Sequence, residues 1–298
     1  MMRHPQFWPS VALVLAAAAW GLFWLPLRAF EEAGLAAGWA TVGQFLTPAL
    51  PLAPIALWRR AHGKPTGLGR VSSAFCLGAA FALYADSILL TEVARTLILF
   101  YVTPAWSTLL EIVVMRRRLT VARALAVALG LGGLYVILGG DGSVPLPRNT
   151  GDWMALISGM LWAVGTLRVR QKGEDAADFE NVFGFFVYGT GVALLLTLLP
   201  VEALGSRPDG AAILAFVPWL VLLALGFLVP VTFGMLWGAR HVDPGRVGIL
   251  FQMEALCGIV SAALLTAEPF GWIEATGAVL VVSAACVEVV GNRRAAGT

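Results

Sequence analysis

The chain has 298 residues, of which 59% are hydrophobic and 13% are charged, and its net charge at neutral pH is +2. A soluble fold of this length needs far more charged surface, and a disordered chain would be much less apolar, so both classes are excluded. The small net charge also argues against a nucleic-acid-binding protein.

Long stretches without Asp, Glu, Lys or Arg indicate membrane-spanning helices. Four such runs, at 5–27, 33–58, 181–201 and 211–239, are each long enough to cross a hydrocarbon layer of about 30 Å. The first run continues through bulky Trp20 to Trp24, so we expect a mature helix there and not a cleaved signal peptide. Together with shorter uncharged runs, the pattern predicts an all-α integral membrane protein with ten transmembrane helices, at 7–28, 37–58, 71–91, 96–115, 121–139, 152–170, 181–200, 212–237, 246–266 and 271–290.

The basic residues indicate how these helices are oriented. Ten helices place both termini on one side, and if that side is the cytoplasm, sixteen Lys and Arg residues lie inside. Only Arg28, Arg95, Arg148 and Arg207 then lie outside. Because Lys and Arg resist translocation, we expect both termini in the cytoplasm of a bacterial inner (plasma) membrane.

The two halves of the sequence resemble each other. Aligning Trp20 with Trp162 also aligns Arg28 with Arg170, and in a second alignment Pro104 matches Glu254. With five helices in each half, the second half is inverted relative to the first, an arrangement typical of transporters. We therefore expect a first repeat at 1–140, a linker at 141–151 and a second repeat at 152–298, which together enclose a central cavity.

Several segments resemble a known family. The stretches ALISGMLWAVGTLRVRQK and FALYADSILLTEVARTLILFYVTPAWSTLLEIVVMRRRLT resemble signatures of the EamA branch of the drug/metabolite transporter superfamily. The run YVILGGDGS is similar to that of the branch's exporters of aromatic amino acids. The resemblance implies a basket of ten helices around a central cavity, and export of aromatic or other bulky apolar amino acids. Two positions depart from the family pattern: Arg118 replaces an acidic residue, and Glu254 replaces a proline.

Aromatic side chains inside the predicted helices are candidates for the wall of a substrate site. An amino acid exporter needs apolar walls for the side chain and a few polar groups for the zwitterion. The alternative interpretation is that these aromatics pack the core or anchor the helices at the membrane interface. The candidates are Trp20, Phe23, Trp24, Phe81, Tyr84, Tyr101 and Trp162.

Three carboxylates lie inside predicted helices, where an ionisable group is costly unless it faces protein or water. Glu111 lies near Arg116 to Arg118, and we expect it to pair with them at the surface. Asp86 either serves as a coupling or polar site, or reaches external water, or pairs with Arg95. Glu254 is the deepest, with Gln252 close by. It either binds a substrate amine, or carries a coupling proton, or bonds only Gln252 or a helix end.

Prolines inside the predicted helices remove backbone donors and indicate kinks or hinges, at Pro26, Pro48, Pro51, Pro54, Pro104 and Pro230. The histidines His4, His62 and His241 fall in loops or tails, and the three cysteines form no CxxC pair. We therefore expect no catalytic residue, metal site or cofactor, and no enzyme. The predicted partners are an amino acid substrate and the lipid bilayer, with no nucleic acid. Export of other small metabolites or drugs, a membrane-embedded enzyme and a non-transporting membrane protein are the alternatives.

Overall fold

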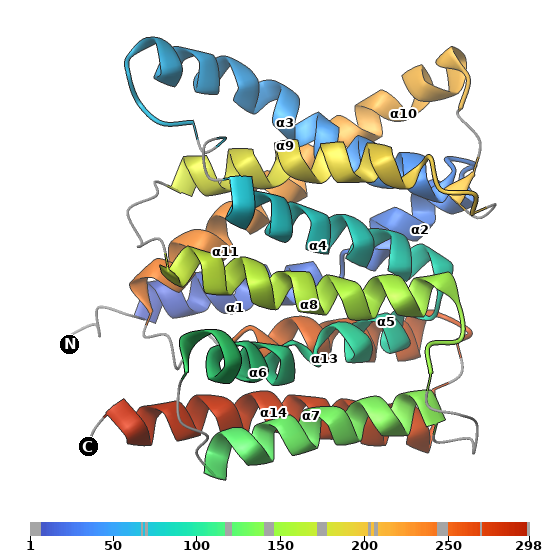
Figure 1. Cartoon of the computed structure of the whole chain (residues 1–298). Coiled ribbons are helices and arrows are strands. Elements are labelled where there is room, and N and C mark those ends of the chain that lie inside the picture. Colours follow the sequence, from blue (N-terminus) through green and yellow to red (C-terminus); the bar gives the residue numbers. More distant parts are fainter. Residues whose placement is uncertain are drawn as a thin grey trace.

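The computed structural model describes residues 7–66, 68, 71–116, 121–139, 146–171, 178–201, 204–205, 208–242, 250–268 and 270–296. These residues form helices joined by loops, with no strand among them. The helices lie side by side in stacked rows, and both termini lie at the same end of the bundle (Figure 1). The all-helical class predicted from the sequence is thereby confirmed.

The helices follow one another along the chain with short connections. The first half contains α1 (Phe7–Gly21), α2 (Trp24–Glu32), α3 (Ala37–Ala61), α4 (Val71–Leu90), α5 (Val93–Phe100), α6 (Thr103–Met115) and α7 (Val121–Gly139). The second half contains α8 (Thr150–Gln171), α9 (Asp178–Leu196), α10 (Gly210–Leu223), the π-helical turn η2 (Ala224–Leu228), α11 (Val229–His241), α13 (Gln252–Leu265) and α14 (Trp272–Ala296).

The described helices carry the features of a membrane protein. Six helical stretches are long and apolar enough to cross a membrane, and three further helices are apolar but shorter. Large apolar side chains lie on the outside, such as Leu214 at 73% exposure and Leu264 at 77%. Polar side chains such as Gln44 and Asp86 are buried instead. This distribution suits a surface covered by lipid, because large apolar side chains exposed to water would carry a large hydrophobic free-energy cost.

Two helices that we predicted as continuous, at 7–28 and 96–115, are interrupted, although Phe7–Glu32 and Val93–Val114 are each still long and apolar enough for one membrane span. The first divides at Leu22–Phe23, and the second at Tyr101–Val102. Each break lies just before a proline, Pro26 or Pro104, that provides no N–H for the carbonyl four residues earlier. The Leu22 carbonyl accepts from the Leu25 N–H at 3.1 Å instead. The sequence indicated these prolines as kinks but not that the helices would end there.

The other prolines differ in their effect. Pro48, Pro51 and Pro54 all lie inside α3, which continues through them as one helix. Pro230 lies in the first turn of α11, directly after the π-helical turn η2. There the Val229 N–H reaches back to the Ala224 carbonyl, which keeps the helical path continuous. The predicted span 212–237 is thus one path with a local widening.

Helices from the two halves pack against each other throughout the bundle. α7 lies along α14, α3 packs on α9, and α5 contacts α13. α4 packs against α8 and α9, while α1 packs against α11 and α13. The pairing of α7 with α14 at one edge is plain in Figure 1. The core therefore consists of contacts between the halves, and the helix breaks lie within it.

Candidate functional site

A cluster of aromatic rings lies where the broken helices meet α4 and α8, and Phe81 on α4 is at its centre. The Phe81 ring centroid lies 5.1 Å from Trp20, 5.1 Å from Trp162 and 5.8 Å from Tyr84. The Trp20 ring also contacts Phe23 at 4.9 Å. Edge-to-face and tilted contacts of this kind are the favoured geometry for aromatic pairs. Trp20, Phe23, Phe81, Tyr84 and Trp162 were all candidates from the sequence, and the fold brings them together.

Further rings complete this cluster, and the sequence analysis did not single them out. Phe100, the last residue of α5, lies 4.9 Å from Tyr84 and 5.3 Å from Tyr101. Phe185 on α9 lies 5.3 Å from Phe81, and Phe227 in η2 stacks 6.4 Å from Phe23. We call Trp20, Phe23, Phe81, Tyr84, Phe100, Tyr101, Trp162, Phe185 and Phe227 the aromatic cluster.

Glu254 points its carboxyl group at the hydroxyl edge of the aromatic cluster. The side chain is 3% exposed and lies in the first turn of α13. The Tyr84 hydroxyl donates to Glu254 Oε1 at 3.5 Å, and the Tyr101 hydroxyl lies within reach of the same carboxyl. In the described part of the chain, no basic side chain forms an ion pair with Glu254. A buried carboxyl that meets only hydroxyl groups is suited to receive a cationic group.

Trp20 supplies a further polar atom in the aromatic cluster, besides the hydroxyls of Tyr84 and Tyr101. Its indole N–H is buried and has no acceptor among the described residues. The neighbouring Trp24 behaves differently, since its N–H donates to Ser261 Oγ on α13 at 3.0 Å. The two indoles lie on either side of the helix break, Trp20 in α1 and Trp24 in α2. Trp20 therefore offers a free donor beside the rings, and Trp24 ties α2 to α13.

The helices carrying Trp20 and Glu254 approach each other closely. Gly21 ends α1, and a Cβ placed on it would lie 2.8 Å from the backbone nitrogen of Gly258. A Cβ on Gly258 would lie 2.5 Å from Leu97 Cδ1 on α5. At Gly21 the added atom would meet backbone, so only glycine allows this approach of α1 to α13, whereas at Gly258 the Leu97 side chain on α5 would have to shift.

Asp86 lies on α4 beyond the aromatic cluster. It is fully buried, so it does not reach external water, and Arg95 pairs with Asp152 instead of with it. These two findings correct both structural interpretations offered for Asp86. The Thr41 hydroxyl on α3 is the polar group that faces it. The side chains of Gln252, Pro104 and Glu111 lie outside the described part of the structure.

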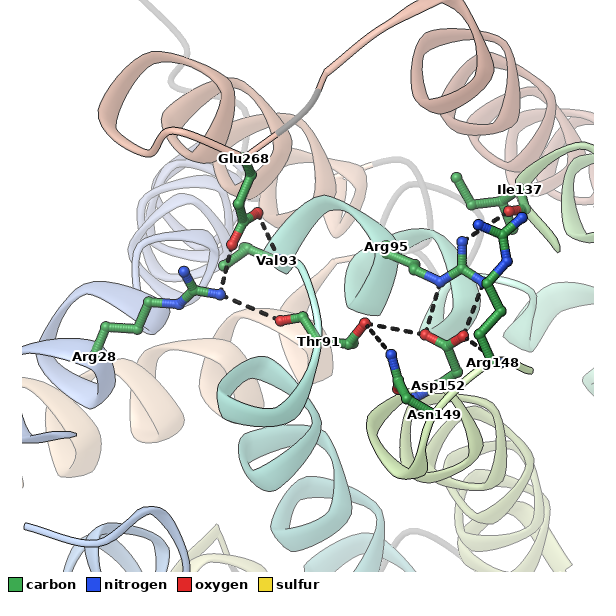
Figure 2. A network of polar contacts seen from close by, with 9 residues as sticks. All are labelled: Arg28, Thr91, Val93, Arg95, Ile137, Arg148, Asn149, Asp152 and Glu268. Atoms are coloured by element: carbon green, nitrogen blue, oxygen red, sulfur yellow. Dashed lines mark hydrogen bonds and ion pairs between the residues drawn. The ribbon is translucent and has the colours of Figure 1, made fainter. Parts of the chain in front are cut away.

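A network of polar contacts joins the helix ends opposite the two termini (Figure 2). Arg28 Nη2 on α2 lies 2.5 Å from Glu268 Oε1, which follows α13. Arg28 also donates to the carbonyls of Ile88 and Thr91, and the Val93 N–H donates to Glu268 Oε2 at 2.8 Å. One ion pair thus connects α2, the α4–α5 loop and the segment after α13.

The second half of this network is a bidentate pair at the start of α8. Arg95 Nε and Nη2 lie 2.7 and 2.8 Å from the two carboxylate oxygens of Asp152. Arg95 also donates to the Ile137 carbonyl of α7 at 2.9 Å. Thr91 joins the two parts of this network, because its hydroxyl donates to Asp152 while its carbonyl accepts from Arg28. We call this set, with Arg148 and Asn149, the outer network.

The opposite end of the bundle has a smaller contact. Arg59 near the end of α3 lies 3.1 Å from Glu180 Oε1 at the start of α9. The Arg59 guanidinium also lies 5.1 Å from the centroid of the Phe179 ring. This pair ties α3 to α9 on the side where the termini lie.

Comparisons with known proteins agree with this architecture. The sequence pattern of the EamA-like transporter family matches residues 7–139 and 149–289. The biotin transporter of Escherichia coli (strain K12) is 25% identical over 239 residues, which cover 79% of this chain and 78% of that protein. An uncharacterized transporter of Archaeoglobus fulgidus is 29% identical over 180 residues, or 59% of each chain. A solved crystal structure shares the fold with a TM-score of 0.60 at 19% identity, and covers 96% of this chain and 97% of its own.

Proposed function

Because the chain belongs to the EamA-like transporter family and is a membrane transporter rather than an enzyme, we propose that it exports amino acids with aromatic or bulky apolar side chains. The observation that carries the substrate class is the Glu254 carboxyl, buried at the edge of the aromatic cluster and faced by two tyrosine hydroxyls. The rings provide the apolar contact, Glu254 receives the ammonium group, and the Trp20 N–H donates to the carboxylate.

The neighbour relations support two inverted repeats of five helices, at 1–140 and 152–298. A twofold relation between the halves exchanges α4 with the path through α10 and α11, and α8 with α1. The contact of α4 with α8 then has a counterpart in the contact of α11 with α1, and both contacts are present. The family pattern also matches the chain in two separate stretches, one in each half. Ten spans in this arrangement can exchange two conformations related by symmetry.

The orientation follows from the charges. Both termini lie at one end of the bundle, and we place that end in the cytoplasm because it carries most of the basic residues. The outer network then lies at the external end, where it holds α2, α8 and the α13–α14 segment together. The described conformation is therefore one in which the external path is closed, and transport requires the outer network to open.

The relative named as a biotin transporter raises biotin as an alternative substrate, and biotin differs from an amino acid in charge. Biotin is an anion without an ammonium group, so the Glu254 carboxyl would repel it, whereas a zwitterion brings its own cation to that carboxyl. In this proposal, biotin competes poorly with aromatic amino acids.

Exchange in proteoliposomes tests the proposal. Vesicles loaded with unlabelled phenylalanine should take up labelled phenylalanine or tryptophan saturably, and excess biotin should not compete. Glu254→Gln should lose most of this uptake, while Glu32→Gln, an exposed carboxylate at the end of α2, should leave it intact. Absence of saturable amino acid exchange, or stronger competition by biotin than by tryptophan, would overturn the proposed substrate.

A further inference from the structure

Three buried polar side chains between α3 and α4 have no hydrogen-bond partner in the described structure. Both carboxylate oxygens of Asp86 are unpaired, as are both amide atoms of Gln44 and the hydroxyl of Thr41. Asp86 and Thr41 are fully buried, and Gln44 is 1% exposed. An unpaired polar group inside a protein is costly, and three together indicate a site that completes its bonds with something else.

The three side chains belong to one place in the fold. Thr41 faces the Asp86 carboxyl directly, and α3 packs on α4. Gln44 lies three residues after Thr41 on α3, and residues at this spacing share a helix face. Ser87, the neighbour of Asp86, is bonded to the Tyr84 carbonyl at 2.7 Å and takes no part.

Among the described residues, no charged group around α4 serves as a counter-ion to Asp86. The outer network holds Arg28, Arg95 and Asp152, and Glu180 pairs with Arg59 at the other end of the bundle. Among the described side chains, the remaining charged groups on the helices packed around α4 are Glu31 and Glu32 on α2, Arg60 on α3, and Arg168 on α8, which acts on Cys76 of α4. Tyr188 on α9 bonds the Leu68 carbonyl. None of them forms an ion pair with Asp86 in the described structure, and Thr41 is the polar side chain that faces its carboxyl.

We propose that Asp86, with Thr41 and Gln44, forms a site that binds and releases a proton and thereby couples substrate export to a proton gradient. The protonated carboxyl donates to the Gln44 or Thr41 oxygen, and the ionised carboxylate accepts from the Gln44 amide and the Thr41 hydroxyl. One proton leaves the site toward one side as one substrate moves the opposite way. This assignment rests on the proposed function and separates the proton site from Glu254, which meets the substrate.

A gradient experiment separates the two proposals. Vesicles with an acidic lumen should accumulate labelled phenylalanine, by up to about tenfold per coupled proton for a gradient of one pH unit. Asp86→Asn should keep exchange at equal pH and lose this accumulation. Asp209→Asn should keep both, because Asp209 only caps α10 by accepting from the Ala212 N–H and asparagine caps as well. Absence of exchange in the wild type contradicts the proposed function. Exchange without gradient dependence contradicts only the proton site.

Further outcomes also decide the assignment. Accumulation driven by a sodium gradient at equal pH, or loss of proton drive in Glu254→Gln but not in Asp86→Asn, would overturn it. If Asp86→Asn does not exchange at all, the wild type still provides the test. A hydrophobic carbodiimide reacts only with protonated carboxyls, so it should modify Asp86 and the modification should decline as the pH rises. An unmodified Asp86 at every pH would contradict the proposal.

Discussion

The Tyr101 hydroxyl donates a hydrogen bond to the Phe251 carbonyl oxygen at 3.2 Å, across 150 positions of the chain. The same offset matches Pro104 with Glu254 when the two halves are aligned. The bond therefore joins equivalent positions of the proposed repeats, at the point where α5 ends and shortly before α13 begins. The two halves differ chemically at this point, because one places a proline where the other places the Glu254 carboxyl. The substrate site we propose is thus asymmetric between the two proposed repeats.

Removing the tyrosine hydroxyls should weaken substrate binding. Tyr101→Phe leaves the Phe251 carbonyl without its hydrogen bond and removes a hydroxyl that lies within reach of the Glu254 carboxyl. A hydrogen bond contributes about 1 kcal/mol net, so we expect an apparent affinity for phenylalanine roughly fivefold lower. Tyr84→Phe should have a smaller effect, because its contact with Glu254 is 3.5 Å long. Concentration dependence of exchange in proteoliposomes measures both.

The matched control is Tyr188→Phe. Its hydroxyl donates to the Leu68 carbonyl in an exposed contact away from the aromatic cluster. Equal affinities for Tyr188→Phe and Tyr101→Phe would show that Tyr101 has no particular role at the substrate site.

The sequence located the aromatic candidates better than it located their partners. Trp20, Tyr84 and Trp162 were singled out because they do not lie clearly at a membrane interface, and depth can be counted along a helix. Phe81 was added because it shares a helix face with Tyr84. Phe100 and Phe185 were missed because a phenylalanine in an apolar run carries no mark of which face it takes. Whether these residues bind substrate stays a prediction, since their convergence is a matter of packing.

Ion pairs between residues far apart in the chain could not be predicted from the sequence. Arg95 and Asp152 lie 57 positions apart, and no local spacing connects them. The sequence analysis offered Arg95 as one possible partner of Asp86, and this alternative is wrong because Arg95 pairs with Asp152. The breaks in the first and fourth predicted helices were missed for a related reason. A proline indicates a kink, but whether the chain continues as helix depends on substitutes such as Thr103 Oγ1, which bonds the Phe100 carbonyl at 2.5 Å.

Gly21→Ala should impair transport without unfolding the protein. The new methyl group would meet the backbone of Glu254 and Gly258, so α1 and α13 must move apart and the Glu254 carboxyl must move with them. We expect exchange to fall at least several-fold while the protein still elutes as a single species in detergent. Gly132→Ala on α7 is the control, because nothing lies within 4 Å of the added methyl group. Equal loss in both variants would refute the close-contact argument.

Asp152→Asn should destabilise the whole bundle. The substitution removes one charge from a buried bidentate pair and leaves Arg95 at 6% exposure without a counter-ion. Breaking a buried pair costs about 3–5 kcal/mol, so thermal unfolding in detergent should shift down clearly. The double variant Arg95→Met with Asp152→Leu should recover much of this loss, because apolar residues leave no unpaired charge. A double variant no more stable than Asp152→Asn would contradict this account.

Glu268→Gln should open the external end. The glutamine oxygen can still accept from the Val93 N–H, but the charge that attracts Arg28 is gone, so α2 and the segment after α13 separate more readily. The assay uses a variant without Cys76, Cys257 and Cys286, with a cysteine introduced at the fully buried Thr96 on α5. An impermeant maleimide added outside should label this cysteine several-fold faster when Glu268→Gln is present. Glu274→Gln, on α14 outside the outer network, should leave the rate unchanged. Equal labelling rates with and without Glu268→Gln would mean that the outer network does not close the external path.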